Sequence, residues 1–399
     1  MTALPVGRSP LASALARVLA WTRDVRVRRV VLEAVTLGLV AALVIYIGMR
    51  AREASSLNFD FMQERAGFGI GDQFLTQADG SSTRWHAYFA GVMNTLRITI
   101  FGILLSLGLG LGIGVARLST NWLAAKLAFL YVEAIRNTPL LVFVVFCYTA
   151  VVLRLPRIQE SASLFGVAHF SNRAIALPWP RPQDGAGAFA LALLGGLVVA
   201  WGVWRVLARR EVLTGRPSYP WRGALAVFVA AALVAFVATG MPLRMEAPEV
   251  TRFSYAAGLR LSPEFVGLLL ALSLFNAAFV AEIVRGAIEA VPRGEREAAA
   301  ALGLSGWQQL HLIVLPQALR TMLPPLATQC QNLAKMSSVG IVIAFPDLMT
   351  VGGTVINNSG EAIPVFVLMM ATYFALNLVI AFLLVGPQWR FNWSTGRRA

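Results

Sequence analysis

The chain has 399 residues, of which 57% are hydrophobic and only 14% are charged, and its mean hydropathy is +0.67. Soluble domains carry about 25% charged residues, so this composition excludes an ordinary soluble protein and indicates an integral membrane protein. The net charge is +14, but the arginines lie in short segments between apolar runs, which fits orientation in a membrane better than a nucleic-acid-binding face.

The sequence lacks the residue patterns of catalytic and metal sites. Its three histidines are scattered without the spacing of metal ligands, and its two cysteines, Cys147 and Cys330, lie in apolar runs and suggest no disulfide. No glycine-rich loop ending in Lys-Ser or Lys-Thr is present, and the only lysines are Lys126 and Lys335. We therefore expect no catalytic residue, no metal, no cofactor and no nucleic-acid partner.

The N-terminal region combines a basic segment with an apolar run. Residues 1–29 contain six arginines and one acid, and the run 30–48 is just long enough to cross about 30 Å of hydrocarbon. A cleaved signal peptide is the alternative, but the basic segment is long and no small-residue cleavage site follows. We expect a cytoplasmic tail at 1–29, an uncleaved anchor at 30–48 and a periplasmic loop at 49–89.

The second predicted span, 96–115, is rich in glycine. Small residues at every second to fourth position permit close helix contacts in lipid, where packing drives association. Asn94 or Thr95 is expected to cap this helix.

Two pairs of opposite charges stand at i, i+3 spacing. The first lies in the third span, 127–153, where Pro139 should interrupt the helix. The second follows the span 264–281. A pathway role is the alternative to a structural one. The candidate structural ion pairs are Glu133 with Arg136 and Glu282 with Arg285.

A proline-rich loop at 154–185 leads into two further spans, 187–206 and 223–240. The connector between them, 207–222, carries four arginines and is therefore placed in the cytoplasm. The next polar stretch, 242–263, is then external, although its three arginines fit the positive-inside rule poorly.

The segment beyond residue 316 is polar for a membrane helix. Gln331, Lys335 and Ser338 share one face at helical spacing, and Asn332 lies beside them. Polar groups at membrane depth usually face a cavity or a partner helix, so these four residues are the candidate translocation path. A lysine that snorkels to the boundary is the alternative interpretation of Lys335.

The C-terminal region completes the topology. An external loop at 346–363 precedes the last span, 364–385, and a basic cytoplasmic tail follows at 388–399. The count is eight spans with both termini in the cytoplasm.

A soluble helical hairpin is predicted between residues 295 and 316. A run of strong helix formers ends at Gly303, which suits the left-handed position after a helix. Ser305 and Gln308 have the spacing of a capping box that opens a second helix, and Pro316 stands where the chain should turn back to the membrane. A plain surface connector is the alternative.

The full spacing of this hairpin resembles the cytoplasmic signature loop of ABC-importer permeases. Glu-Ala-Ala is followed after three residues by glycine, and after nine more by an Ile-x-Leu-Pro ending. In that family the loop, here 291–316, docks into a cleft on a separate ATPase subunit. The resemblance assigns the coupling role to Glu297, Ala298, Ala299, Gly303, Ile313, Leu315 and Pro316.

Two longer runs narrow the resemblance. YVEAIRNTPLL at 131–141 and AEIVRGAIEAVPRGEREAAAALG at 281–303 look like the His/Glu/Gln/Arg/opine branch, which carries polar amino acids. The extra spans are similar to those of the larger permease subunit of general L-amino-acid (Aap/Bzt-type) systems. The resemblance implies an all-α protein with a five-helix MetI-like type I domain at about 90–387. An inserted two-span hairpin at about 154–262 and the N-terminal span are added to that core.

The resemblance implies a permease subunit of a binding-protein-dependent importer for L-amino acids in the bacterial inner membrane. Its expected partners are a cytoplasmic ATPase dimer, which hydrolyses the ATP, a periplasmic amino-acid-binding protein, and a second permease or a copy of itself. The alternative is an ion-coupled secondary transporter that uses Lys335, Glu133 and Glu282. Inverted repeats and paired broken helices would favour such a transporter, and we find neither pattern in the sequence.

Overall fold

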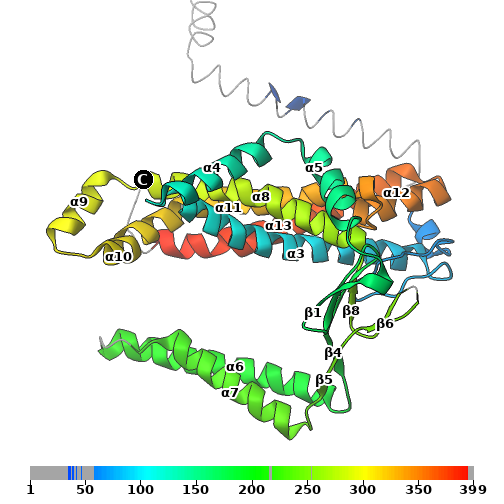
Figure 1. The fold of residues 1–399 in the computed structure, drawn as a ribbon, viewed down its shortest axis with the longest axis horizontal. Coiled ribbons are helices and arrows are strands. Elements are labelled where there is room, and N and C mark those ends of the chain that lie inside the picture. Colours follow the sequence, from blue (N-terminus) through cyan, green and yellow to red (C-terminus); the bar gives the residue numbers. More distant parts are fainter. Residues whose placement is uncertain are drawn as a thin grey trace, which may run out of the picture.

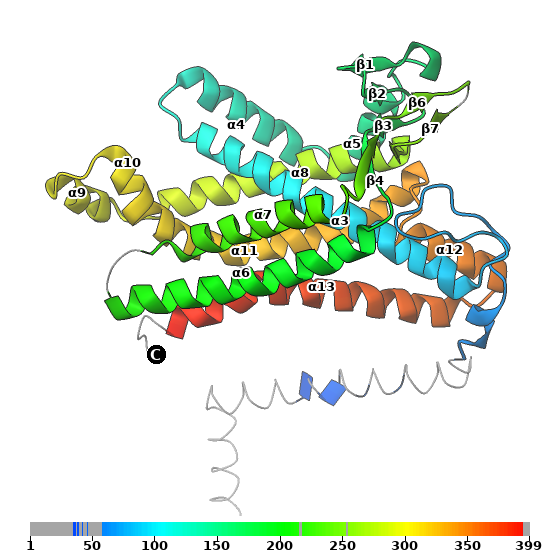
Figure 2. The ribbon, with the colours of Figure 1, turned by 90° about the horizontal axis from the view of Figure 1, so that it is seen from below.

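The computed structural model describes residues 58–214, 218–252 and 254–393, and six isolated positions between 35 and 46. The predicted N-terminal tail lies outside the described residues, and so do all but six positions of the predicted anchor at 30–48. Four long helices form the core bundle in Figures 1 and 2: α3 (Arg84–Arg117), α8 (Pro263–Glu289), α11 (Leu315–Met336) and α13 (Ala362–Trp393).

The described part of the chain contains five helices long and apolar enough to cross a membrane. Two bent helix pairs would each add one broken span, which gives up to seven. Seven of the eight predicted spans correspond to these candidates. The eighth, at 30–48, is not counted because most of it lies outside the described residues.

Glycines on one face of α3 bring it close to α8. A Cβ atom on Gly110 would lie 2.5 Å from the side chain of Val280, and one on Gly114 would lie 2.8 Å from the carbonyl oxygen of Ala281. On the other face, Gly108 and Gly112 would meet nothing within 4 Å. A Cβ atom on Gly102 would lie 3.1 Å from the side chain of Leu333 in α11. The prediction of close helix contacts is therefore confirmed for Gly102, Gly110 and Gly114, but not for Gly108 and Gly112.

The predicted cap of α3 was wrong. The helix begins at Arg84, and the side chain of Thr83 accepts a hydrogen bond from the backbone N–H of His86. Asn94 and Thr95 are instead buried within the helix, where they bind segments distant in sequence. The Asn94 amide donates to the carbonyls of Asp72 and Pro346 at 2.8 and 2.9 Å, and the Thr95 hydroxyl accepts from the N–H of Leu348 at 2.9 Å.

The third predicted span is broken. Helix α4 (Trp122–Arg136) and α5 (Leu140–Phe146), which continues as the π-helical η2 (Cys147–Val152), meet at 108°. Pro139 is the N-cap residue of α5 and lacks the N–H that would continue α4, so the predicted interruption is confirmed. The segment predicted as the third span, 127–153, is therefore a broken pair of helices whose directions differ by 108°.

The predicted loop at 346–363 is mostly helical. Helix α12 (Leu348–Ser359) follows the 3₁₀ segment η5 (Ser337–Ile343) after a 55° bend in the chain. The side chain of Asp347 caps α12 by accepting from the backbone N–H of Thr350 at 2.9 Å. The sequence signal missed here was this Asx cap, because glycines at 352 and 353 favoured a loop.

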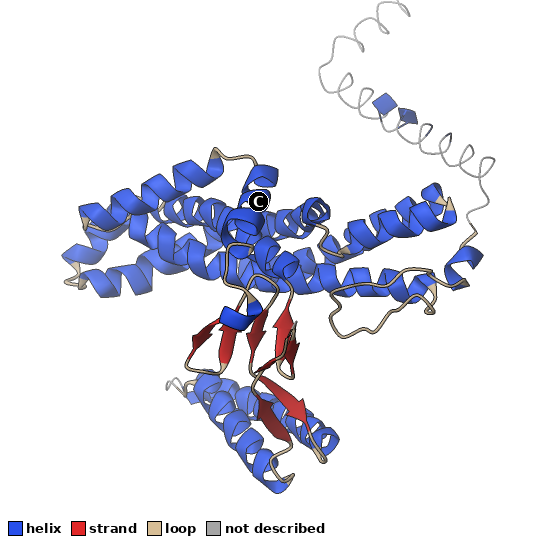
Figure 3. Ribbon diagram, turned by 45° about the vertical axis from the view of Figure 1, so that its right-hand side comes forward, coloured by secondary structure: helices blue, strands red, loops and turns tan. Residues whose placement is uncertain are grey.

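The inserted segment contains strands, so the all-α prediction holds only for the membrane helices. Figure 3 shows the strands between the core bundle and a separate helical hairpin, α6 (Ala186–Thr214) and α7 (Pro220–Ala238), whose two helices pack together. Antiparallel pairing of the two ends of the insert, such as Ile175 opposite Leu261, carries the hairpin away from the core. The four-stranded sheet has the order β1 (Ala162–Leu164), β2 (Ala168–Phe170), β3 (Ile175–Leu177), β8 (Leu259–Leu261).

Two smaller antiparallel pairs complete the insert. One joins β4 (Trp179–Pro182) to β5 (Leu243–Glu246), and the other joins β6 (Glu249–Val250) to β7 (Tyr255–Ala256). Each strand is short, and the β3–β8 and β4–β5 pairings link residues that lie far apart in sequence. Local patterning over three or four residues carries too little signal to distinguish such strands from loop.

Candidate coupling loop and translocation path

The candidate coupling loop projects from one end of the core bundle (Figure 1). Helix α9 (Arg293–Ala301) ends in a Schellman motif, because the N–H of Leu304 donates to the carbonyl of Ala299 at 3.2 Å and that of Gly303 to Ala300 at 2.9 Å. Gly303 has φ +76°, so the predicted left-handed conformation is confirmed.

The second half of the loop begins as predicted and then continues without a turn. Ser305 and Gln308 form both hydrogen bonds of the capping box at the start of α10 (Gly306–Gln308). The chain then runs through the π-helical η4 (Gln309–Val314) into α11, so Pro316 does not turn the chain back. It lies in the first turn of α11, where a residue without an N–H is tolerated.

The loop exposes most of the residues to which the sequence assigned coupling. Glu297, Ala298, Gly303 and Pro316 are exposed, Ile313 and Leu315 are half-buried, and Ala299 is buried. Two large apolar side chains that sequence reasoning missed flank the turn: Leu302 is 81% exposed and Trp307 is 68% exposed. The sequence did contain a signal for them, because two large apolar residues stand on either side of the turn glycine in an otherwise polar loop. The exposed apolar tip is suited to a protein partner.

Polar contacts tie this loop to the core helices. The Arg296 guanidinium donates to the carbonyl of Ile288 near the end of α8 at 2.7 Å. One turn earlier, Arg285 pairs with both Glu282 and Glu289, and Glu282 also pairs with Arg117 at the end of α3. These charges therefore form one connected network from α8 to α3, beside the base of the loop.

The two candidate ion pairs differ. Glu282 and Arg285 are paired in the network just described. Among the described residues, no ion pair joins Glu133 to Arg136: Glu133 accepts from the Asn137 amide, and Arg136 lies 5.6 Å from the ring centroid of Phe279. Both glutamates have an arginine at i+3, yet only Glu282 is paired with it. The tertiary neighbours of each glutamate therefore determine whether the ion pair forms.

The four candidate path residues lie on the last turns of α11 and on η5. The Gln331 amide donates to the carbonyl of Asn377 in α13 at 3.0 Å, while the Lys335 side chain is exposed. The Asn332 amide donates to Gln329, and the Ser338 hydroxyl donates to the carbonyl of Lys335. The polar face predicted from the sequence is therefore half-buried to exposed. The buried side of the same helix is apolar and comprises Ala327, Cys330, Leu333 and Ala334.

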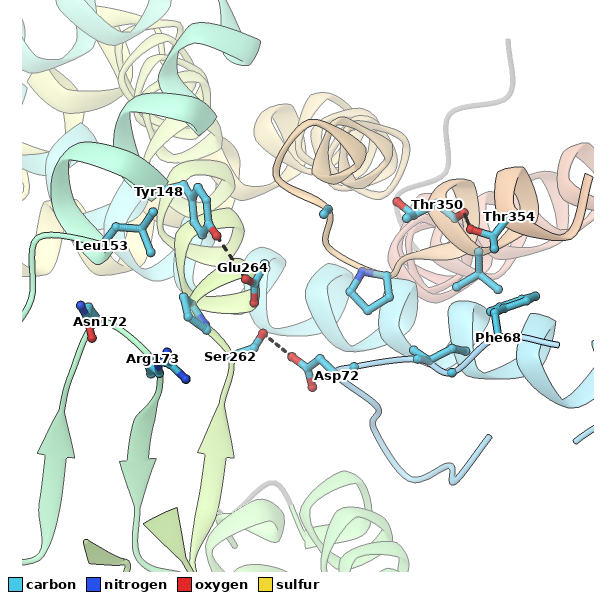
Figure 4. Close-up of a pocket in the computed structure, with 17 residues that line it drawn as sticks. Phe68, Asp72, Tyr148, Leu153, Asn172, Arg173, Ser262, Glu264, Thr350 and Thr354 are labelled. Atoms are coloured by element: carbon cyan, nitrogen blue, oxygen red, sulfur yellow. Dashed lines mark hydrogen bonds between the residues drawn. The ribbon is translucent and has the colours of Figure 1, made fainter. Parts of the chain in front are cut away.

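A cavity of about 690 Å³ lies at the other end of the core and is called here the vestibule (Figure 4). Its polar lining includes Asp72, Ser262 and Glu264, and the Tyr148 hydroxyl donates to the Glu264 carboxylate at 3.1 Å. Further lining residues come from the insert, among them Asn172 and Arg173.

Sequence reasoning missed the vestibule and the buried ion pair beside it. Arg97 lies in α3 with its side chain 3% exposed, and it pairs with Asp72 at 3.0 Å, whose side chain is 12% exposed. The guanidinium also lies 3.7 Å from the ring centroid of Phe265. An arginine within an apolar helix was the available signal, because such residues are costly unless they are paired.

No group of three or more His, Cys, Asp or Glu side chains in the described part of the chain is arranged to hold a metal ion. The polar contacts described above are hydrogen bonds and ion pairs within helices, between helices and between helices and loops.

Comparison with known proteins identifies the family. Residues 225–386 match the family described as binding-protein-dependent transport system inner membrane component. The general L-amino acid transport system permease protein AapQ of Rhizobium johnstonii is 38% identical over 349 residues, 88% of this chain and 85% of that protein.

Two other relatives are also named as permeases of amino-acid or putative amino-acid transport systems. The putative amino-acid ABC transporter permease protein YhdX of Escherichia coli is 37% identical over 327 residues, 82% of this chain and 83% of that protein. The glutamate/glutamine/aspartate/asparagine transport system permease protein BztB of Rhodobacter capsulatus is 33% identical over 400 residues, 90% of this chain and 93% of that protein.

The chain belongs to the family of inner-membrane components of binding-protein-dependent transport systems. The predicted ABC permease family is thereby confirmed, and the importer interpretation is favoured over the ion-coupled alternative. The chain is a multi-pass membrane protein of a family of transport permeases.

Proposed function

We propose that this chain is the permease subunit of an ABC importer for L-amino acids, which forms the translocation path and is driven by a separate ATPase dimer. The named relatives support amino acids as the cargo class, because each is a permease of an amino-acid or putative amino-acid system. Hydrolysis of ATP occurs in the partner chain. The membrane is the bacterial inner membrane, and both termini are cytoplasmic.

The observation that carries this proposal is the exposed coupling loop. A short helix, a left-handed glycine and a capping box hold the tip residues Leu302 and Trp307 beyond the end of the bundle. An apolar tip flanked by charged residues is the composition of a protein contact. The ATPase dimer therefore docks at residues 291–316, with Glu297, Ala298 and Ala299 on α9 and Gly303 at the turn that follows it.

The proposed mechanism is alternating access. ATP closes the ATPase dimer and moves the loop, and the loop pulls on α8 through the Arg296–Ile288 hydrogen bond. The network of Arg285, Glu282 and Arg117 passes this movement from α8 to α3. A bistable arrangement of helices then opens the path to one side at a time.

The proposed path follows the polar face of α11, with Gln331, Asn332, Lys335 and Ser338, and leads from the vestibule. A second permease subunit, in preference to a second copy of this chain, supplies the other half of the path across a pseudo-twofold axis. A periplasmic binding protein delivers the amino acid. The domain boundaries follow the sequence: anchor 30–48, periplasmic loop 49–89, transport domain 90–387 with the insert at 154–262, and tail 388–399.

Transport in proteoliposomes tests the proposal. The chain is co-expressed with its ATPase and second permease, reconstituted, and supplied with radiolabelled L-amino acids and a binding protein. We expect uptake with ATP and no proton gradient. Uptake driven by a proton gradient in the absence of ATP would contradict the importer and restore the secondary transporter.

A further inference from the structure

A second cavity, of about 310 Å³, lies in the insert next to the vestibule. We call it the arginine pocket. None of the described residues that line it is acidic. They are Arg157, Ile158, Gln159, Asn172, Arg173 and Arg252.

The three arginines converge because a small apolar core joins three segments of the insert. Ile158, Ala176 and Tyr255 pack together and are 3%, 0% and 2% exposed. One arginine directly precedes Ile158, and the other two stand three residues before Ala176 and Tyr255. Each segment that reaches this core therefore delivers one arginine to the same pocket.

Hydrogen bonds fix the backbone around the pocket. The N–H of Asn172 donates to the carbonyl of Pro156 at 2.9 Å, and the Gln159 amide donates to the carbonyl of Arg252 at 2.8 Å. The arginine residues themselves are exposed. Long cationic side chains are thus presented to solvent from a fixed base, which lowers the ordering cost of binding a charged partner.

Two of the three arginines, Arg157 and Arg173, are not neutralised by an acid in the part of the chain that the structure describes. Within the described residues, neither Arg157 nor Arg173 lies within ion-pair distance of a carboxylate. Arg181, in the neighbouring β4–β5 pair, does have such a partner, Glu246, at 3.1 Å. In the proposed topology these arginines are periplasmic, contrary to the positive-inside rule, so membrane orientation does not account for them.

The pocket shares Asn172 and Arg173 with the lining of the vestibule. A ligand of the arginine pocket therefore lies at the mouth of the vestibule. The proposed function requires a soluble protein to release its cargo at this mouth.

We propose that the arginine pocket docks carboxylate side chains of the substrate-binding protein and thereby holds that protein over the vestibule. This inference rests on the proposed function. Guanidinium groups bind carboxylates through paired hydrogen bonds, and charge complementarity at an exposed surface raises the association rate in a salt-dependent manner. The insert is thus a docking platform, and its acidic partner surface belongs to the binding protein.

The test uses the whole transporter, with its ATPase, in lipid nanodiscs. The probe is a purified amino-acid-binding protein that stimulates ATP hydrolysis by the wild-type complex. Arg157→Glu and Arg173→Glu are combined in one variant, and Arg181→Glu reverses a charge elsewhere on the same insert as the control. Size-exclusion chromatography verifies that each complex is assembled.

We expect the double variant to raise the concentration of binding protein for half-maximal stimulation by about tenfold, and to weaken its dependence on salt. The control should stay within about twofold of wild type. An unchanged half-maximal concentration in the double variant overturns the docking site. Competition by millimolar free aspartate in the wild type but not in the double variant overturns it too, because the pocket would then bind solute.

The same preparation separates failure of this inference from failure of the proposed function. ATP-driven uptake by the wild-type complex, together with unchanged docking in the double variant, removes the docking site alone. Absence of ATP-driven uptake by the wild type removes the proposed function, and the docking site with it.

Discussion

The coupling loop and the inserted sheet are held together by contacts of opposite range. In the loop, the turn at Gly303 and the capping box at Ser305 are made by residues at most five positions apart. In the insert, β3 pairs with β8 across the whole helical hairpin, and Gln159 bonds to Arg252 over 93 residues. The loop can therefore form its shape before the rest of the chain is packed, whereas the insert cannot.

This difference separates the two surfaces in function as well as in folding. The loop presents an apolar tip, Leu302 and Trp307, whose orientation depends on the positive φ of Gly303. The insert shows a partner cations whose convergence depends on a small buried core. A change in one surface is thus expected to leave the other intact.

The largest effect is expected at the turn. Gly303→Val places a β-branched residue at φ +76°, at a cost of about 1–3 kcal/mol, although nothing lies within 4 Å of its Cβ position. The strain misdirects α9, so co-purification of the ATPase and uptake should both be lost while the protein remains in the membrane. Glu297→Lys tests the same surface by charge reversal.

Gly294→Val is the matched control, because it adds the same side chain to α9 at a position with open space and no positive φ. It should retain the ATPase. Wild-type ATPase binding and uptake in both Gly303→Val and Glu297→Lys would reduce the loop to a connector.

The second prediction concerns the insert. Ala176→Asp puts a carboxylate into the fully buried core beside Ile158 and Tyr255, at a cost of at least about 2 kcal/mol. The insert should become sensitive to protease in sealed, right-side-out vesicles and stimulation by the binding protein should fall, while the ATPase still co-purifies. Ser163→Asp, on the exposed strand β1, is the control. Loss of ATPase binding in Ala176→Asp would show that the two surfaces are not independent.

Sequence reasoning succeeded where contacts are local and failed where they are not. It found the left-handed glycine, the capping box and the interruption at Pro139, each of which is encoded within a few residues. It mistook Asn94 and Thr95 for caps, because their true partners near residues 72 and 347 are distant in sequence. The β3–β8 and β4–β5 pairings, and the two cavities lined by segments distant in sequence, depend on contacts that no local pattern reveals.

A third prediction tests the close helix contact that the glycines of α3 led us to expect. Gly110→Leu forces a side chain into Val280, at a cost of about 1–3 kcal/mol, whereas Gly112→Leu points into open space. The melting temperature of the purified complex should fall for the first variant and change little for the second. Equal shifts would mean that glycine content, and not the packed face, determines the effect.

The fourth prediction concerns the path. Gln331→Leu and Lys335→Leu should each lower uptake by roughly tenfold while the complex still assembles. Both substitutions remove a polar group from the polar, half-buried to exposed face of α11. Lys126→Leu, which alters the only other lysine, should leave uptake unchanged. Normal uptake kinetics in both path variants would assign this face to packing or to snorkelling.

The smallest effect is expected from two glutamates that look alike in sequence. Glu282→Gln removes the counter-charge of Arg117 and leaves Arg285 with Glu289 alone. The cost is on the order of 1 kcal/mol, because the carboxylate is 27% exposed and therefore screened in part by solvent. Glu133→Gln breaks no ion pair and should cost less than about 0.5 kcal/mol. Double-mutant cycles on thermal stability, pairing Glu282 with Arg285 and Glu133 with Arg136, measure the difference directly. The first cycle should give a coupling energy of about 0.5 kcal/mol or more, and the second should give nearly none. Equal coupling energies in both cycles would mean that the i, i+3 spacing alone creates the ion pair. Tertiary neighbours would then not determine which glutamate is paired.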